Sequence, residues 1–234
     1  MMRASFAAHF SELRKRLTLV IAFFVAIFVW LYSIKELLLN ALTLPVLQVL
    51  PAGQNLVYTG VGELFFTYIK ICALGAFALS LPVLLWQLWR FALPGLYEKE
   101  RRILRPYLIA VPALFYIGCA FAFTLIVPIA LKFFLGFVEE GVYPLPSVKE
   151  YLSFLLNMLL AFGVSFELPV ILVLAMQTGL LKVESLVQNR RIAIVLVFIV
   201  AAILTPPDPL SQTMLAVPML LLYEAAVLIG KRLK

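Results

Sequence analysis

Long apolar runs without charged residues alternate with short polar segments along the whole chain. A helix needs about 20 mostly apolar residues to cross a hydrocarbon core of roughly 30 Å. Six runs approach this length, so the pattern predicts an all-α integral membrane protein with six transmembrane helices, in one polytopic membrane domain over residues 1–234. The predicted spans are approximately residues 17–34, 64–89, 106–131, 151–180, 192–206 and 209–229.

Prolines lie inside several of these spans. Each one removes a backbone hydrogen bond and bends its helix, so the pattern predicts a curved, proline-bent bundle. The prolines in question are Pro82, Pro112, Pro128, Pro169 and Pro218.

The last two spans are expected to be short. The fifth run has 14 residues from Ile192 to Thr205, which corresponds to about 21 Å of helix. The sixth run, up to Glu224, is similarly brief. Two adjacent short helices, joined by Pro206-Pro207-Asp208, are expected to thin the bilayer beside them.

The distribution of basic residues predicts the orientation. If the N-terminus lies inside, fifteen Lys and Arg residues fall in inner segments and four fall in outer segments. Because cytoplasmic segments carry the excess of basic residues, both termini are predicted to be cytoplasmic. The four outer residues are Lys35, Lys70, Lys132 and Lys149.

Composition narrows the class of protein further. The chain is 64% hydrophobic and 13% charged, which excludes a soluble domain. The net charge of +7 reflects this topology and attraction to anionic lipid, and no nucleic-acid binding is expected. Cys72 and Cys119 lie in predicted spans and are interpreted as packing residues, and no residue spacing suits a metal ion.

The first 16 residues are predicted to form an amphipathic helix along the inner membrane surface. Apolar side chains recur there at helical spacing, at Phe6, Phe10, Leu13 and Leu17. Glu12 has two interpretations: an ordinary ion pair with a basic residue one turn later, or part of a functional site.

The outer segment from Lys35 to Glu63 is too long for a tight turn. Its leucines predict a short interfacial helix that ends at Pro45, and Pro51-Ala52-Gly53 predicts a turn.

A polar segment from Phe91 to Arg102 separates the second and third spans. Pro94-Gly95 ends the preceding helix, so Glu98 and Glu100 fall near the start of the next one. Acidic residues in that position stabilise a helix through its dipole. The alternative is that they bind a ligand.

Glu167 lies near the middle of the fourth span. An acidic residue there costs on the order of 2.5–3.5 kcal/mol on insertion scales, which excludes a side chain facing lipid. Pro169 bends the helix and frees the carbonyl of Ser165. Glu167 is therefore either protonated and hydrogen-bonded inside the bundle, or faces a cavity or a polar group of a partner.

Several activities lack the residues they need. His9 is the single histidine and Asp208 the single aspartate, so no hydrolytic set of residues exists within the spans. No glycine-rich phosphate loop is present, and the chain is not predicted to be an enzyme. A proton-coupled secondary transporter that uses Glu167 remains the alternative function, although the chain shows none of the internal repeats usual for that class.

Five sequence blocks resemble the TatC family, the multi-span subunit of the twin-arginine protein translocase. They follow one another in family order from His9 to Glu224. The blocks are HFSELRKRL at 9–17, PGLYEKERR at 94–102, FGVSFELP at 162–169, LTPPDPLSQ at 204–212, and AVPM with LYE at 216–224.

The resemblance implies a receptor in the bacterial or archaeal cytoplasmic membrane. Such a receptor binds the twin-arginine signal peptides of folded cargo proteins on its cytoplasmic face. It then recruits single-span TatA/TatB-type subunits and other TatC copies. The proton-motive force drives export, and no bound cofactor is implied.

The resemblance also assigns residues. Signal-peptide binding falls on Glu12, Glu100, Phe91 and Arg14; the intramembrane acid is Glu167; the partner-docking polar residues are Thr205 and Gln212; and the outer-side functional positions are Pro45 and Asp208. One objection is electrostatic, because nearby cations should repel a basic peptide. These cations must therefore face lipid phosphate or pair elsewhere, for example with Glu98.

Overall fold

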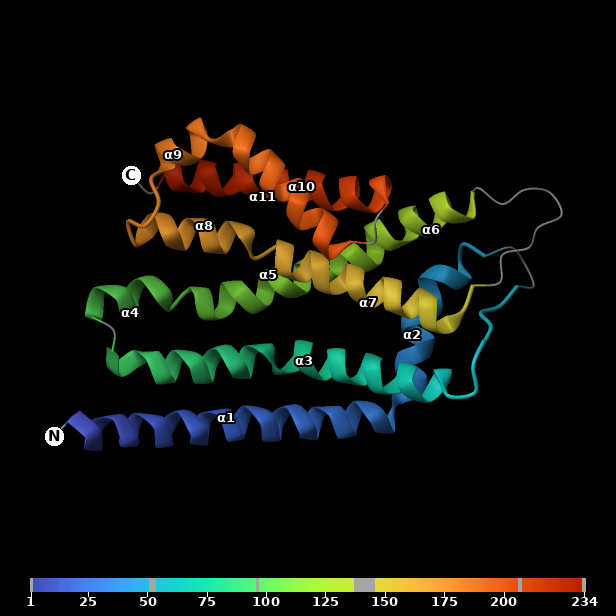
Figure 1. The fold of residues 1–234 in the computed structure, drawn as a ribbon, viewed down its shortest axis with the longest axis horizontal. Coiled ribbons are helices and arrows are strands. Elements are labelled where there is room, and N and C mark those ends of the chain that lie inside the picture. Colours follow the sequence, from blue (N-terminus) through green and yellow to red (C-terminus); the bar gives the residue numbers. More distant parts are fainter. Residues whose placement is uncertain (1, 51–53, 96, 137–145, 206–207, 233–234) are drawn as a thin grey trace. The chain divides into compact units, whose positions relative to one another are not determined.

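The structure is a computed structural model that describes residues 2–50, 54–95, 97–136, 146–205 and 208–232. Over these ranges the protein is helical, and no β-strand is present apart from an isolated bridge between Val57 and Ser147. In chain order the elements are α1 (Met2–Ser33), α2 (Lys35–Leu47), α3 (Glu63–Ala92), the 3₁₀ turn η1 (Leu93–Gly95), α4 (Glu98–Leu104), α5 (Tyr107–Phe121), the π turn η2 (Ala122–Ile126), α6 (Val127–Leu135), α7 (Val148–Ser165), α8 (Leu168–Gln177), α9 (Val183–Gln188), α10 (Arg190–Leu204) and α11 (Pro209–Arg232) (Figure 1).

Five helical segments are long and apolar enough to cross a membrane. They confirm that the protein is an all-α membrane protein, and they match five of the six predicted spans. The remaining predicted span is α10, whose 15 residues give a helix of about 22 Å. The five segments are Ser11–Ser33, Glu63–Gly95, Glu98–Leu135, Val148–Gln177 and Pro209–Arg232.

The chain forms two compact units, which are described separately. The first comprises Met1–Leu39 and Phe65–Pro112, and the second comprises Asn40–Leu64 and Ala113–Lys234.

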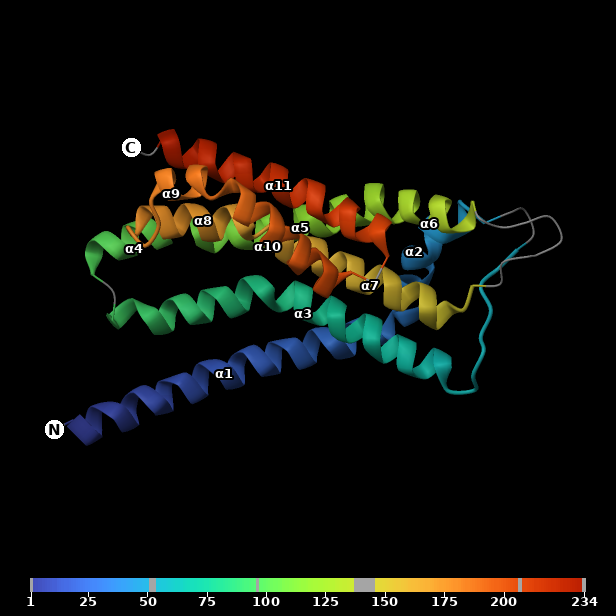
Figure 2. The same ribbon diagram turned by 45° about the horizontal axis from the view of Figure 1, so that its top comes forward.

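In the first unit, α1 and α3 run antiparallel (Figures 1 and 2). They approach closely where Leu31 packs on Gly75, since a Cβ atom at position 75 would lie 2.9 Å from Cδ1 of Leu31. The outward apolar side chains of α1 remain exposed, with Val29 and Trp30 each 58% exposed. This surface suits contact with lipid rather than with water.

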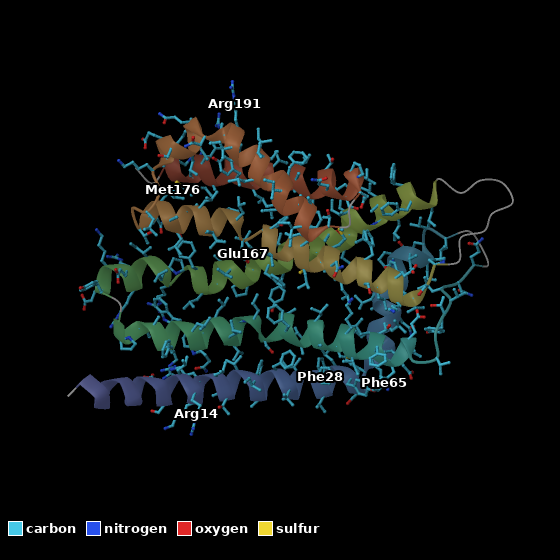
Figure 3. The ribbon with its side chains drawn as sticks, in the orientation of Figure 1. Arg14, Phe28, Phe65, Glu167, Met176 and Arg191 are labelled. Atoms are coloured by element: carbon cyan, nitrogen blue, oxygen red, sulfur yellow. The ribbon has the colours of Figure 1, made fainter. Side chains whose placement is uncertain are left out.

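Prolines interrupt two long helices of the second unit, as predicted. Pro128 follows the π turn η2, which separates α5 from α6. Pro169 stands in the first turn of α8, after the turn at Phe166 and Glu167 that separates α7 from α8 (Figure 3).

Two glycines bring α5 and α7 together in the second unit. The Cβ of a residue at 118 would lie 2.5 Å from the carbonyl oxygen of Phe162, and one at 163 would lie 2.7 Å from the ring of Phe115. The backbones therefore touch at this crossing. Around it lie fully buried side chains, including Phe162, Leu155 and Met158. Elsewhere in this unit α11 packs against α8 and α10.

A buried acid fastens two connections of the second unit. Glu63, at the start of α3, is 7% exposed. Its Oε2 accepts hydrogen bonds from the amide and hydroxyl of Thr59, at 2.7 and 2.8 Å, and from the amide of Gly60 at 3.1 Å. Its Oε1 accepts bonds from the hydroxyl of Ser147 at 2.7 Å and the amide of Lys149 at 2.8 Å. One carboxylate thus ties the entry to α3 to the entry to α7.

Three predictions about helix ends need correction. The sixth span is not short: α11 has 24 residues, about 36 Å, and it continues past Glu224, which pairs with Arg190 at 2.7 Å. Residues 2–16 continue directly into the rest of α1, because no glycine or proline interrupts the helix before Ser33. The helix α2 continues through Pro45 to Leu47. The predicted turn at 51–53 lies outside the described residues.

Candidate functional site

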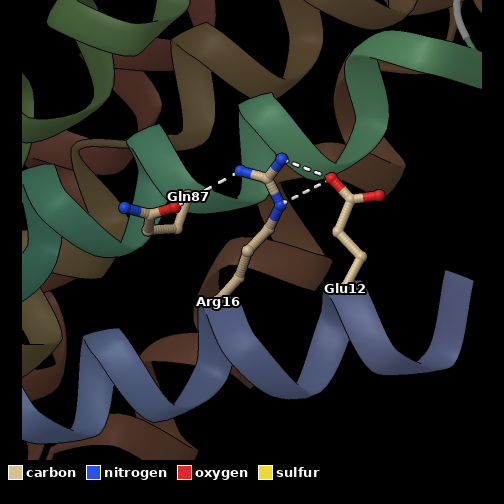
Figure 4. A network of polar contacts seen from close by, with 3 residues as sticks. All are labelled: Glu12, Arg16 and Gln87. Carbon is tan, nitrogen blue, oxygen red and sulfur yellow. Dashed lines mark hydrogen bonds and ion pairs between the residues drawn. The ribbon is translucent and has the colours of Figure 1, made fainter. Parts of the chain in front are cut away.

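Glu12 lies in a small polar cluster between α1 and α3 of the first unit (Figure 4). Arg16, one turn along α1, donates to Oε1 of Glu12 through Nε at 3.1 Å and through Nη2 at 2.5 Å. Its Nη1 donates to Oε1 of Gln87 on α3, at 3.4 Å. Of the two interpretations of Glu12, the structure shows the ion pair with a basic residue one turn later. Sequence reasoning missed Gln87, which offered no signal beyond being a polar residue in an apolar span.

The two partners of this ion pair differ in exposure. The Arg16 side chain is 18% exposed and that of Glu12 is 41% exposed. Arg14 is exposed, and its side chain extends from α1 on the side away from α3 (Figure 3). Two residues of this helix are expected to bind the signal peptide. Of these, Glu12 faces α3 and Arg14 does not.

Glu100 helps to start α4. Its Oε2 accepts a hydrogen bond from the backbone amide of Tyr97 at 2.9 Å, which satisfies a donor at the beginning of the helix. Arg101 donates through Nη2 to the carbonyl of Leu93 in η1, at 2.7 Å. Phe91 is half-buried in the last turn of α3. Of the two interpretations of Glu100, stabilising a helix start or binding a ligand, the structure shows the first.

Three basic residues of this loop line a cavity. A cavity of about 540 Å³ opens between the end of α3, η1, α4 and the start of α5. Arg101, Arg102 and Arg105 line it, together with Glu98. Neither Glu12 nor Glu100 lines this cavity.

Glu167 occupies the turn between α7 and α8 in the second unit, with φ −76° and ψ −14°. Both of its carboxylate oxygens are buried, and neither forms a hydrogen bond of standard geometry with a described residue; the backbone of Phe115 on α5 is the one polar group that interacts with the carboxylate among the described residues. The hydroxyl of the neighbouring Ser165 donates instead to the carbonyl of Ala161, at 2.6 Å. A buried carboxyl that lacks hydrogen bonds is costly, so the site is incomplete without another polar group.

The polar residues at the α10–α11 connection form bonds within the second unit. Thr205 is 6% exposed, and its hydroxyl donates to the carbonyl of Ala201 at 2.8 Å. Gln212 donates through Nε2 to the carbonyl of Phe198 on α10, at 3.0 Å. Thr205 thus bonds to the last turn of α10, and Gln212 connects α11 to α10.

Pro45 and Asp208, which the resemblance assigned to the outer side, have local structural roles. Asp208 precedes α11, and its Oδ1 accepts the backbone amide of Ser211 at 2.7 Å, which caps a helix that starts at Pro209. Its Oδ2 is buried and has no hydrogen-bond partner among the described residues. Pro45 lies inside α2, close to Leu42, whose carbonyl accepts the hydroxyl of Tyr151 at 2.8 Å.

Sequence reasoning treated Glu63 only as the end of a loop. Its sequence signal is an acid at a helix start, preceded by the turn-forming pair Thr59-Gly60. Ser147 and Lys149 are 84 and 86 residues away in the chain, so no local pattern could have indicated those contacts.

These features define the class of protein, a polytopic helical membrane protein. Its first unit carries the acidic residues Glu12 and Glu100, and its second unit holds the buried carboxyl of Glu167 within a span. The family model described as Sec-independent protein translocase protein (TatC) matches residues 8–218. The chain therefore belongs to the TatC family. It is a component of the Sec-independent protein translocase, a transport subunit rather than an enzyme.

Individual relatives agree over nearly the full length. The Sec-independent protein translocase protein TatC of Magnetococcus marinus is 41% identical over 98% of this chain and 84% of its own length. The TatC of Escherichia coli K12 is 40% identical over 95% of this chain and 86% of its own length. These matches favour the translocase over the secondary transporter.

A solved structure shares the fold. A crystal structure described as twin arginine translocase receptor TatC superposes with a TM-score of 0.80 and 36% identity, over 95% of this chain and 98% of that one. A second crystal structure of the receptor, in DDM, gives a TM-score of 0.81 and 35% identity, over 95% of this chain and 99% of that one.

Proposed function

We propose that this chain is the signal-peptide receptor of a twin-arginine translocase and that Glu12 and Glu100 bind the paired arginines of folded cargo. The observation that supports this most directly is the guanidinium that Glu12 already holds through two donors of Arg16. A carboxylate accepts an arginine fork through two donors, and a lysine cannot reproduce that geometry. Solved relatives with this fold are described as twin arginine translocase receptors.

The difference in exposure suggests how a peptide arginine reaches Glu12. Glu12 is 41% exposed, whereas Arg16 is 18% exposed and also bonds to Gln87. A peptide arginine approaches the carboxylate from solvent while Arg16 keeps its place between the helices. At Glu100 the peptide arginine shares the carboxylate with the amide of Tyr97. Phe91 and the exposed Arg14 complete the proposed surface.

The test compares Glu100→Gln with Glu98→Gln, a matched control two residues away in the same helix. The purified chain in detergent is titrated with fluorescent signal peptides that carry Arg-Arg or Lys-Lys. Loss of a charge-assisted bond of about 1.5–3 kcal/mol predicts roughly 10- to 100-fold weaker binding of the Arg-Arg peptide to Glu100→Gln. Glu98→Gln is expected to stay within about twofold. Equal losses in both variants would refute a specific carboxylate–arginine contact and leave only general acidity.

A photo-cross-linking side chain at position 100 gives a second readout. It is expected to capture the Arg-Arg peptide and not the Lys-Lys peptide. No capture by position 100, together with none by position 12, would rule out this site.

We also propose that Glu167 receives a polar side chain from a single-span TatA/TatB-type subunit, with Thr205 and Gln212 at the same docking region and other TatC copies as neighbours. Its two buried oxygens, which form no hydrogen bond of standard geometry with a described residue, support this assignment. Glu167→Gln keeps hydrogen bonding, so it should retain co-purification of the partner subunit, whereas Glu167→Leu should lose it. Retention by Glu167→Leu would contradict the assignment.

The proposed location is the cytoplasmic membrane, with both termini inside, six spans including α10, and transport driven by the proton-motive force. The positive-inside distribution of Lys and Arg supports it. Single cysteines at the exposed positions Tyr58 and Lys231 test the orientation in whole cells, using an impermeant maleimide. Labelling at 58 and not at 231 is expected, and the reverse result would overturn the topology. Protonophore treatment should stop export of a twin-arginine reporter.

A further inference from the structure

The cavity beside α4 in the first unit combines two kinds of side chain. One wall is aromatic, formed by Trp86 and Trp89 from the last turns of α3. The other is charged, formed by Glu98, Arg101, Arg102 and Arg105. At about 540 Å³ it is large enough for a polar group bearing an apolar body.

The charges in this cavity favour an anion. Three arginines face one glutamate, so the lining carries a net charge of +2. Arg102 and Arg105 form no ion pair with any residue that the structure describes. Arg101 is held over η1 by its bond to the carbonyl of Leu93, at 2.7 Å. Clustered guanidinium groups bind phosphate oxygens through parallel hydrogen bonds, which makes phosphate the best-fitting anion.

The aromatic wall indicates what else the ligand carries. Trp86 is 53% exposed although it lies at the end of an apolar membrane span. Tryptophans in that position sit at the level of lipid headgroups, where the indole contacts the glycerol region and the upper acyl chains. A free phosphate ion uses only the arginines, whereas a phospholipid uses both walls.

We propose that this cavity binds the headgroup of an anionic phospholipid, with its phosphate on Arg101, Arg102 and Arg105 and its glycerol region against Trp86 and Trp89. The positively charged lining disfavours a basic signal peptide, so this site is distinct from Glu12 and Glu100. The proposal goes beyond peptide recognition and does not depend on it. It also gives the arginines beside Glu100 a binding role that keeps them from repelling the peptide.

The test uses the tryptophans of the cavity as reporters. The chain has three tryptophans, and Trp30→Phe leaves Trp86 and Trp89. The full-length Trp30→Phe protein is reconstituted into nanodiscs with brominated phosphatidylglycerol or brominated phosphatidylcholine, and quenching gives the relative binding constant of the two lipids. A clear preference for phosphatidylglycerol is expected. Equal quenching by both lipids would overturn the proposal.

Two double variants separate the cavity from general charge. R102Q/R105Q removes two cations that line the cavity, and R90Q/K99Q removes two from the same segment that do not. R102Q/R105Q is expected to reduce the preference for phosphatidylglycerol over phosphatidylcholine by about fivefold per arginine. R90Q/K99Q is expected to leave that preference unchanged. An equal reduction by both pairs would show that overall charge, not this cavity, selects the lipid. If R102Q/R105Q is not recovered folded, Arg105→Gln alone gives the same readout at about fivefold.

A final comparison distinguishes the two sources of phosphate. Inorganic phosphate is added against chloride at matched ionic strength. No displacement of phosphatidylglycerol beyond the chloride control is expected, because the aromatic wall contributes to lipid binding. Displacement by inorganic phosphate alone would identify a free-anion site and overturn the lipid assignment.

Discussion

Replacing Glu63 by Gln tests whether one buried carboxylate holds together the connections that lead into α3 and α7 in the second unit. The carboxylate accepts five hydrogen bonds, three at Oε2 and two at Oε1. Glutamine has nearly the same shape, but one of its two terminal atoms is an NH₂ group that only donates. If the amide oxygen stays toward Thr59 and Gly60, its nitrogen faces the amide of Lys149, which is also a donor.

The expected cost follows from these contacts. The bonds of Ser147 and Lys149 to a charged acceptor are each worth about 1.5–3 kcal/mol. The Ser147 hydroxyl can rotate to accept from the new NH₂ group, so the loss is expected near the lower end, at about 3 kcal/mol in total. For a chain of this size, about 3 kcal/mol corresponds to a Tm decrease of roughly 6–12 °C.

The assay is thermal unfolding in detergent, followed by a thiol-reactive fluorophore. Cys72 is fully buried and Cys119 is partly buried, so both become reactive as the helices separate. Glu150→Gln is the matched control, because Glu150 is exposed in the first turn of α7. Its Tm is expected to change by less than about 2 °C. Equal Tm values for Glu63→Gln and Glu150→Gln would refute the reasoning that these bonds stabilise the fold.

Two further substitutions probe close packing and helix capping. Gly118→Ala places a Cβ atom 2.5 Å from the carbonyl oxygen of Phe162, so the two helices must separate, at a cost of about 1–3 kcal/mol in unfolding free energy. Gly95→Ala is the control in the same unfolding assay, because its Cβ atom meets nothing within 4 Å. An unchanged Tm for Gly118→Ala would contradict the close contact. Asp208→Ala removes the side-chain cap on the Ser211 amide and should lower the free energy of unfolding by about 0.5–2 kcal/mol. Asp208→Asn should keep most of that stability, because its side-chain oxygen still accepts the hydrogen bond. Equal losses of stability in both variants would show that the charge, not the cap, is what matters.

Elements whose cause is local were predictable. Apolar run length predicted the long spans, and the run of 14 residues from Ile192 predicted a short helix, which the structure shows as α10 with 15 residues. Pro169 predicted the interruption beside Glu167, since a proline removes a bond from its own helix. The i,i+4 spacing of Glu12 and Arg16 offered their ion pair as one of two interpretations of Glu12, and the structure shows that pair.

The partner of Glu224 was not predictable. The sixth apolar run up to Glu224 was expected to be brief, with a span over residues 209–229, whereas α11 extends to Arg232. Glu224 pairs there with Arg190, 34 residues earlier in the chain. A charge pattern read along one segment cannot supply that partner.

The sequence by itself determined the class of this protein, its long helices, its proline breaks and its family, because hydropathy, backbone chemistry and motif order are properties of neighbouring residues. Tertiary structure alone decided which polar groups are satisfied: Glu63 gains five hydrogen bonds, Glu167 has none with the described residues, and three arginines share one cavity. The physical reason is that burial and hydrogen bonding depend on groups brought together from segments far apart in the chain. These groups decide whether a buried acid is fully hydrogen-bonded and stabilises the fold, or keeps free hydrogen-bonding capacity for a partner.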